Sequence, residues 1–131
     1  MICLPIPPSV NELYRKAAFK GGKGRTVTPK YAAWREEAGL RLNLAAWDTP
    51  APPYGIKIRM NINHNSDIDN RIKPLLDLLV KHGVLTGDQW VNALHVYRDR
   101  TIDGCIVEFF DTDCITIGEA ANRVLAGLVV E

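Results

Sequence analysis

Apolar and polar residues alternate over residues 56–62 (IKIRMNI), and this period of two predicts a strand with one buried face. Residues 1–6 predict a short strand that ends at a pair of prolines. Residues 91–100 and 104–110 flank a short turn and predict two strands that form an antiparallel pair. The stretch between residues 9 and 30 has three glycines and no such alternation, and it predicts a loop.

Two stretches show helical periodicity. Between residues 29 and 46 apolar residues recur at helical spacing, and Thr28 with Pro29 provides an N-cap and a proline at the first helical position. Residues 71–82 carry an apolar stripe followed by Gly83, which predicts a second helix with a glycine stop. The mixture of strands and helices indicates an α/β (α+β) fold, in which a small mixed sheet packs against helices.

A third amphipathic segment closes the chain. Thr116 and Glu119 have the spacing of a capping box, and the residues after them place apolar side chains on one side of a helix. We therefore expect a single domain over residues 1–112 and a C-terminal amphipathic helix or tail over residues 113–131. The apolar face of that helix would pack on the core or on a second subunit.

The composition is that of a globular protein. Apolar residues make up 47% and charged residues 24% of the 131 residues, which suits one domain with one core. No apolar run reaches the roughly 18–20 residues of a membrane span, and no secretory signal is visible. The cysteines have no C-x-x-C spacing, so we expect a reduced, cytoplasmic setting and no structural zinc. They are Cys3, Cys105 and Cys114.

Charge is unevenly distributed, although the net charge is only +1. Between residues 15 and 35 there are basic residues but no acidic ones, whereas most aspartates follow residue 66. A basic segment beside an acidic cluster suits a metal-dependent enzyme that acts on phosphodiesters, but a solvated, flexible loop explains the basic segment equally well. The basic residues are Arg15, Lys16, Lys20, Lys23, Arg25, Lys30 and Arg35.

The polar segment 61–70 (NINHNSDIDN) holds two carboxylates two residues apart. In an extended backbone Asp67 and Asp69 point to the same side, where a hard cation such as Mg²⁺ would neutralise their repulsion. The competing interpretation is that Asp69 or Asn70 caps the helix that begins near residue 71, which explains one carboxylate but not both. Taken alone, the segment fits a turn with a helix cap better than a metal site.

Two further residues, Lys73 and Asp88, help to decide between a helix cap and a metal site. Lys73 lies four residues after Asp69 in the first helical turn, so its ammonium group can reach the same site and stabilise charge on a reacting phosphate. On a generic helix it would be a surface lysine. Asp88 follows the helix, and the sequence alone does not show that it returns to the other acids. EF-hand, P-loop, dinucleotide-binding and zinc-hydrolase motifs are absent.

Segment 67–91 (DIDNRIKPLLDLLVKHGVLTGDQWV) resembles the RusA family of Holliday-junction endonucleases. The shared pattern is D-x-D-N, a lysine three residues later, an aspartate four further on, a helix that ends in glycine, and an acidic turn. Segments 4–15 and 24–38 are similar to the family's N-terminal strand with its Pro-Pro-Ser turn and to its basic loop, so the resemblance covers residues 1–110. The matching positions are Asp67, Asp69, Asn70, Lys73, Asp77, Gly83 and Asp88.

The resemblance implies a RusA-like domain and a cytoplasmic, bacterial or phage-encoded endonuclease that resolves four-way junctions by paired nicks. It implies Asp67, Asp69 and Asp88 as ligands of Mg²⁺, which Mn²⁺ can replace, and Lys73 as a catalytic lysine. It also implies a homodimer, because paired nicks need two active sites related by a two-fold axis. The candidate DNA-binding residues are then Arg15, Lys16, Lys20, Lys23, Arg25 and Lys30.

One position departs from the family pattern. The turn often carries two adjacent aspartates, and here Gly87 replaces the first, while Asp88 matches the second by its spacing from Lys73. This leaves open a catalytically weak or inactive junction-DNA-binding protein of the same fold. A D-x-D nucleotidyltransferase that holds a nucleotide diphosphate through Mg²⁺ is a further alternative. The short chain and the missing Gly-Ser helix start disfavour it.

Overall fold

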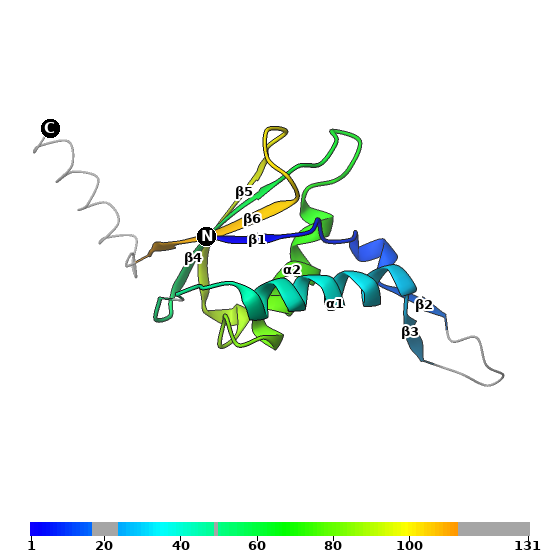
Figure 1. Cartoon of the computed structure of the whole chain (residues 1–131), viewed down its shortest axis with the longest axis horizontal. Helices are drawn as coiled ribbons and strands as arrows, with labels where there is room; N and C mark the ends of the chain where they lie inside the picture. Colours follow the sequence, from blue (N-terminus) through cyan, green and yellow to red (C-terminus); the bar gives the residue numbers. More distant parts are fainter. Residues whose placement is uncertain (17–23, 49, 113–131) are drawn as a thin grey trace, which may run out of the picture.

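The fold is a mixed sheet with helices on one face (Figure 1). The computed structural model describes residues 1–16, 24–48 and 50–112. Within these residues four strands form the main sheet in the order β1-β6-β4-β5, and a hairpin, β2-β3, stands apart from it. This architecture confirms the expected α/β (α+β) class. The strands of the main sheet are β1 (Ile2–Leu4), β4 (Tyr54–Met60), β5 (Val91–Arg98) and β6 (Cys105–Asp111).

Strand β4 lies at the centre of the sheet and of the core. The side chains of Tyr54, Ile56, Ile58 and Met60 are buried, whereas the side chain of Lys57 lies on the opposite face and is partly exposed. The predicted alternation is confirmed, although the strand begins and ends two residues earlier than predicted. Each fully buried aliphatic side chain stabilises the fold by about 1.5–3 kcal/mol.

The predicted pairing of the last two strands is wrong. β5 pairs with β4 in parallel and β6 pairs with β4 in antiparallel orientation, so β4 lies between them. A buried strand needs hydrogen-bond partners for its backbone groups on both edges. Strand β4 has them because the chain, after forming β5 on one edge of β4, crosses over and forms β6 on the other edge. The connection passes the end of β4, where the Asp99 N–H donates to the Met60 carbonyl (2.9 Å) and the Asn61 N–H to the Gly104 carbonyl (3.0 Å).

Helices α1 (Pro29–Leu44) and α2 (Ile72–Lys81) cover the buried face of the sheet (Figure 1). The predicted N-cap of α1 is confirmed, because the Thr28 hydroxyl accepts a hydrogen bond from the Tyr31 N–H (3.2 Å). A short 3-10 turn, η2 (Asp69–Arg71), precedes α2. The buried side chains that the helices add to the core are Tyr31, Trp34, Ala38, Leu42, Leu75, Leu78 and Leu79.

The N-terminal region forms a hairpin where the sequence predicts a loop. After the 3-10 turn η1 (Val10–Glu12), strands β2 (Tyr14–Lys16) and β3 (Arg25–Val27) pair antiparallel and project from the start of α1 (Figure 1). The Thr28 N–H holds the base of the hairpin by donating to the Leu13 carbonyl (3.0 Å). Three-residue strands are too short to produce a recognisable alternation in the sequence.

The predicted C-terminal helix, with Cys114 just before it, lies outside the described residues, and the domain boundary at residue 112 stays a prediction. No helix within residues 1–16, 24–48 and 50–112 is long and apolar enough to cross a membrane.

Cys3 is exposed, whereas Cys105 is buried, and burial raises the pKa of the Cys105 thiol to about 12. Cys105 is therefore a protonated core residue at neutral pH.

Gly104 and Gly83 form a matched pair that tests the packing of β1 against the β5–β6 connection. Both have positive φ angles (69° and 76°), but a Cβ at Gly104 would lie 2.5 Å from the Leu4 carbonyl oxygen, whereas one at Gly83 meets nothing within 4 Å. Gly83→Ala should lower the free energy of unfolding by about 1–2 kcal/mol, the cost of a left-handed backbone. Gly104→Ala should lower it further, because the Leu4 backbone must also shift. Urea unfolding measures both, and equal losses would contradict the close packing.

Candidate active site

The polar segment after β4 is fixed at its start by hydrogen bonds with the β5–β6 connection and with the end of β5. Arg98 Nη1 donates to the Asn63 carbonyl (2.6 Å), and Arg100 Nη1 donates to the Asn63 side-chain oxygen (2.7 Å). The Asn61 side-chain amide donates to the Ile102 carbonyl (2.8 Å). Two of the asparagines in this segment therefore have structural roles, and they set the path of the chain toward the aspartates.

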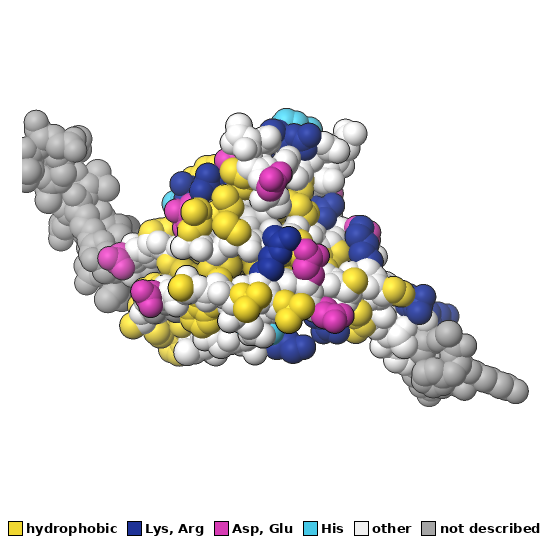
Figure 2. Space-filling view, in the orientation of Figure 1, with side chains coloured by type: hydrophobic (Ala, Val, Ile, Leu, Met, Phe, Trp, Pro, Cys, Tyr) yellow, Lys and Arg dark blue, Asp and Glu magenta, His cyan; other side chains and the backbone are white. Residues whose placement is uncertain are grey.

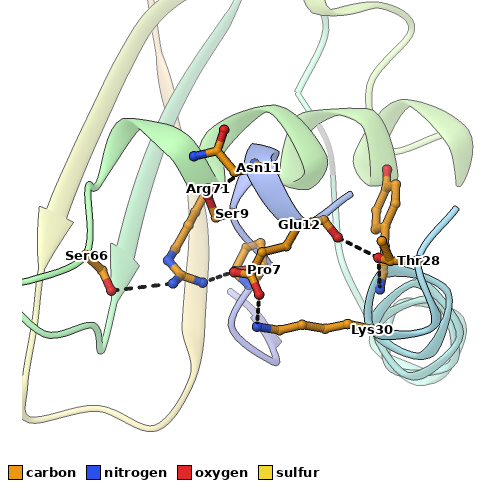
Figure 3. A network of polar contacts seen from close by, with 9 residues as sticks. Pro7, Ser9, Asn11, Glu12, Thr28, Lys30, Ser66 and Arg71 are labelled. Carbon is orange, nitrogen blue, oxygen red and sulfur yellow. Dashed lines mark hydrogen bonds and ion pairs between the residues drawn. The ribbon is translucent and has the colours of Figure 1, made fainter. Parts of the chain in front are cut away.

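Arg71 ties the acidic turn to the N-terminal segment (Figure 3). Its Nη1 donates to the Pro7 carbonyl (2.6 Å) and its Nη2 to the Ser66 hydroxyl (3.5 Å). Its Nε is buried and has no hydrogen-bond partner among the described residues. Sequence reasoning missed this residue, because its main partner lies 64 positions away and no local pattern marks the pair.

The helix-cap interpretation of the D-x-D segment is wrong. The N-cap positions are occupied by Ile68 for η2 and Arg71 for α2, and neither makes a side-chain capping hydrogen bond. Asn70 instead donates from its side chain to the Asp67 carboxylate (3.3 Å). Capping therefore does not account for the exposed carboxylate of Asp69.

The structure brings Asp69, Lys73 and Asp88 to the rim of one hollow of about 330 Å³. Asp69 belongs to η2, Lys73 to the first turn of α2, and Asp88 begins the 3-10 turn η3 (Asp88–Trp90). Asp67 does not line this hollow, and its carboxylate is held by Asn70. The lining residues are Asp69, Ile72, Lys73, Leu76, Asp77 and Asp88.

Asp88 reaches the hollow because the chain reverses at the end of α2. The N–H groups of Val84 and Leu85 donate to a carbonyl in α2 (2.9 and 3.2 Å), and both side chains are buried. The Tyr54 hydroxyl, at the start of β4, accepts a hydrogen bond from the Thr86 N–H (3.2 Å) and lies 3.3 Å from the Thr86 hydroxyl oxygen. The segment between α2 and β5 therefore brings Asp88 back beside α2, and strand β5 has no part in this return.

Lys73 pairs with Asp77, one helical turn further along α2. Its Nζ lies 3.3 Å from an Asp77 carboxylate oxygen, and the side chains are 67% and 42% exposed. Exposed pairs at this spacing contribute only about 0.3–0.5 kcal/mol, so the ammonium group can exchange its partner for a phosphate at little cost. Asp77 matches the family pattern but has no predicted role, although its i,i+4 spacing from Lys73 is a signal for this pair.

The donors at the hollow suit a hard divalent cation. Asp69 and Asp88 offer carboxylate oxygens, and Mg²⁺ is usually held by one or two carboxylates together with water and substrate phosphate. In the described part of the chain, no three acidic, histidine or cysteine side chains lie close enough together to hold a metal ion unaided. The ligand set of three aspartates therefore stays a prediction, which requires Asp67 to turn away from Asn70.

The predicted DNA-binding residues differ in their surroundings. Arg15, Lys16 and Arg25 are exposed on the hairpin, at the end of the molecule where dark blue side chains lie in Figure 2. Lys30 instead pairs with Glu12 (Figure 3), and this hydrogen bond lowers the pKa of the Glu12 carboxyl. A DNA phosphate would have to compete with that carboxylate. Lys20 and Lys23 lie outside the described residues.

Comparison with protein families matches residues 5–108 to the family model Endodeoxyribonuclease RusA. The match covers most of the chain and includes α1, α2 and every residue of the candidate carboxylate site. A search of curated proteins finds no match. The family resemblance predicted from the D-x-D-N segment is therefore confirmed.

The Tyr54 hydroxyl should be needed to hold the turn that carries Asp88. Tyr54→Phe keeps the buried ring but removes the contacts with Thr86, so we expect the free energy of unfolding to fall by about 1–2 kcal/mol. Tyr97→Phe is the matched control, because Tyr97 is 48% exposed and the loss of its hydroxyl should be neutral. Urea unfolding compares the two variants. Equally small changes in both would contradict the anchoring role of Tyr54.

Proposed function

Because this chain belongs to the endodeoxyribonuclease RusA family, we propose that it is a Mg²⁺-dependent nuclease that resolves four-way DNA junctions by paired nicks in recombination and repair. The observation that carries the proposal is the hollow beside α2, which is lined by Asp69, Asp88 and Lys73. Carboxylates that hold a cation and an ammonium group that contacts a phosphate are the groups that phosphodiester hydrolysis uses. Membership of a nuclease family favours this chemistry over nucleotide transfer.

Asp69 and Asp88 would hold Mg²⁺ in this proposal, and Asp67 would join them once its carboxylate leaves Asn70. A bound Mg²⁺ would neutralise charge at the scissile phosphate and lower the pKa of the attacking water. Mn²⁺ accepts the same oxygen ligands and should support the reaction as well. Turns η2 and η3 place Asp69 and Asp88 beside the same hollow, where two carboxylates can share one cation.

Lys73 contacts the scissile phosphate once its ammonium group leaves Asp77. From the first turn of α2 it would donate hydrogen bonds to a non-bridging oxygen and stabilise the negative charge that develops there. Ile72 and Leu76 supply the apolar part of the wall of the hollow.

Binding of DNA is assigned to the basic residues of the hairpin region. Arg15, Lys16 and Arg25 are exposed there, and each contact with a phosphate releases counterions, so affinity should fall steeply with salt. A second copy of the chain supplies the second active site that symmetric resolution needs. We assign the reaction to the cytoplasm, in keeping with the free thiols of Cys3 and Cys105. The residues to which we assign DNA binding also include Lys20, Lys23 and Lys30.

Asp69→Asn should stop cleavage and leave junction binding intact. The substitution preserves side-chain size but removes the negative charge that holds the cation, so we expect the cleavage rate to fall on the order of 100-fold or more. The matched control is Asp103→Asn, which removes an exposed carboxylate from the turn between β5 and β6. Cleavage is measured on an end-labelled four-way junction with Mg²⁺, and binding is measured by gel shift.

A folded Asp69→Asn protein that cuts at the wild-type rate would show that Asp69 is not a metal ligand. An equal loss in Asp103→Asn would show that the effect is not specific to the hollow. The Lys73→Met variant should also cleave slowly. Its cleavage rate should stay low when Mn²⁺ replaces Mg²⁺, because the ammonium group acts on the phosphate directly.

Gly87 favours a second candidate function, junction binding with weak or absent cleavage. It stands beside Asp88, where the family pattern often has another aspartate. Its backbone is extended (φ 175°, ψ 150°), a conformation that any residue adopts, so the turn does not require glycine. A Cβ there would lie 2.2 Å from the side-chain oxygen of Gln89, which is the end of an exposed side chain. A rotamer change of Gln89 would therefore relieve the contact with a Cβ at this position.

Gly87→Asp tests the second candidate. If the missing acid limits catalysis, the variant should cut four-way junctions faster than the wild type, by roughly 10-fold. Gly87→Asn is the control of equal size and should give no gain, because it adds no negative charge. An equal rate in wild type and Gly87→Asp, or an equal gain with both variants, would contradict this candidate.

A further inference from the structure

The hairpin carries a second hollow, distinct from the carboxylate site, in which Tyr14 lies among basic residues. Its volume is about 380 Å³, which is in the range of pockets that hold small ligands. The Tyr14 ring is 45% exposed, so part of its surface is open to a ligand in the hollow. The lining residues are Val10, Asn11, Tyr14, Arg15, Lys16 and Arg25.

A chain of aromatic contacts connects the Tyr14 ring to the core. Tyr14 and Tyr31 meet edge-to-face, with ring centroids 5.9 Å apart and planes at 84°. Tyr31 is buried and stacks on Trp34 at 6.3 Å, and the Trp34 indole N–H donates to the Pro5 carbonyl (3.0 Å). One edge-to-face neighbour covers at most one face of a ring. Tyr14 therefore has ring surface left for another planar group.

The cations around Tyr14 are placed by the register of the hairpin. Tyr14 pairs with Val27 and Lys16 pairs with Arg25, so Tyr14, Lys16 and Arg25 share one face of the two-stranded ribbon. Arg15 also lines the hollow. An exposed aromatic ring beside several cations is the combination that binds unpaired nucleotides, because the ring stacks on a base while the cations bind phosphates.

The hollow adjoins the candidate active site. Turn η1, which supplies Val10 and Asn11 to the hollow, packs against turn η2, which carries Asp69. The two regions are therefore joined by turns of the chain that contact each other directly.

We propose that this hollow binds one unpaired nucleotide at the branch point of the DNA, with its base stacked on Tyr14 and its phosphate held by Lys16 and Arg25. The inference rests on the proposed function and deepens it, because it names what distinguishes a junction from duplex DNA. In a duplex every base is stacked and paired, so only the cations would be used. At a branch point a base can leave the stack and reach the ring.

The test compares Tyr14→Leu with Tyr14→Phe. Leucine keeps an apolar side chain against Tyr31 but removes the ring, whereas phenylalanine keeps the ring and removes only the hydroxyl. The probes are a four-way junction with 2-aminopurine at the branch point and a linear duplex of the same sequence, with Kd measured by fluorescence anisotropy without Mg²⁺. We expect Tyr14→Leu to bind the junction roughly 5- to 100-fold more weakly and the duplex as wild type does. Tyr14→Phe should match wild type on both.

The 2-aminopurine signal gives a second readout. Stacking on Tyr14 should quench its fluorescence in wild type and in Tyr14→Phe, and the quenching should be lost in Tyr14→Leu. Unchanged junction affinity and quenching in Tyr14→Leu, or equal losses on junction and duplex, would overturn the proposal. If wild type shows this ring-dependent binding but never cuts the junction, the nucleotide site is supported and the proposed catalysis fails. If cutting is normal and the ring has no effect, the nucleotide site alone fails.

Discussion

The candidate site depends on the parallel pairing of β4 with β5. Parallel neighbours cannot be joined by a tight turn, so residues 61–90 must leave the sheet, cross its face and return. Helix α2 is that crossover, and its apolar stripe is buried against the sheet. The polar side of α2 then faces solvent. Turn η2 before the helix brings Asp69 to this side, and turn η3 after the helix brings Asp88 to it. One connection of the fold therefore gathers Asp69, Lys73 and Asp88 around a single hollow.

Polar contacts fix both ends of this crossover. At its start Arg71 bonds to the Pro7 carbonyl and Arg98 bonds to the segment after β4, while at its end Tyr54 bonds to Thr86. Where such a bond is sheltered from water, loss of one partner leaves the other unsatisfied, which costs more than the bond contributes. These bonds fix the backbone path of the crossover at both ends, so that only the side chains of Asp67 and Lys73 have to change partners when a cation and substrate bind.

Features that a short segment encodes by itself could be predicted from the sequence, and features that depend on distant partners could not. The alternation in β4, the cap at Thr28 and the apolar stripe of α2 are local signals, and the structure contains all three elements. The partner of β5 depends on which edge of β4 is open, so the predicted β5–β6 pair was wrong. For the site, spacing identified Asp69 and Lys73. Only the reversal after α2 brings Asp88 to them.

Metal-dependent resolution of a four-way junction is tested directly by incubating the wild-type protein with the junction, with and without Mg²⁺, and mapping the cuts on each labelled strand. A metal-dependent site on each of two subunits predicts cuts at symmetric positions in two opposite strands, no cuts when the metal is chelated, and no cuts in linear duplex. Cleavage that persists without a divalent metal, or stable binding of the junction with no cleavage in either Mg²⁺ or Mn²⁺, would contradict the account.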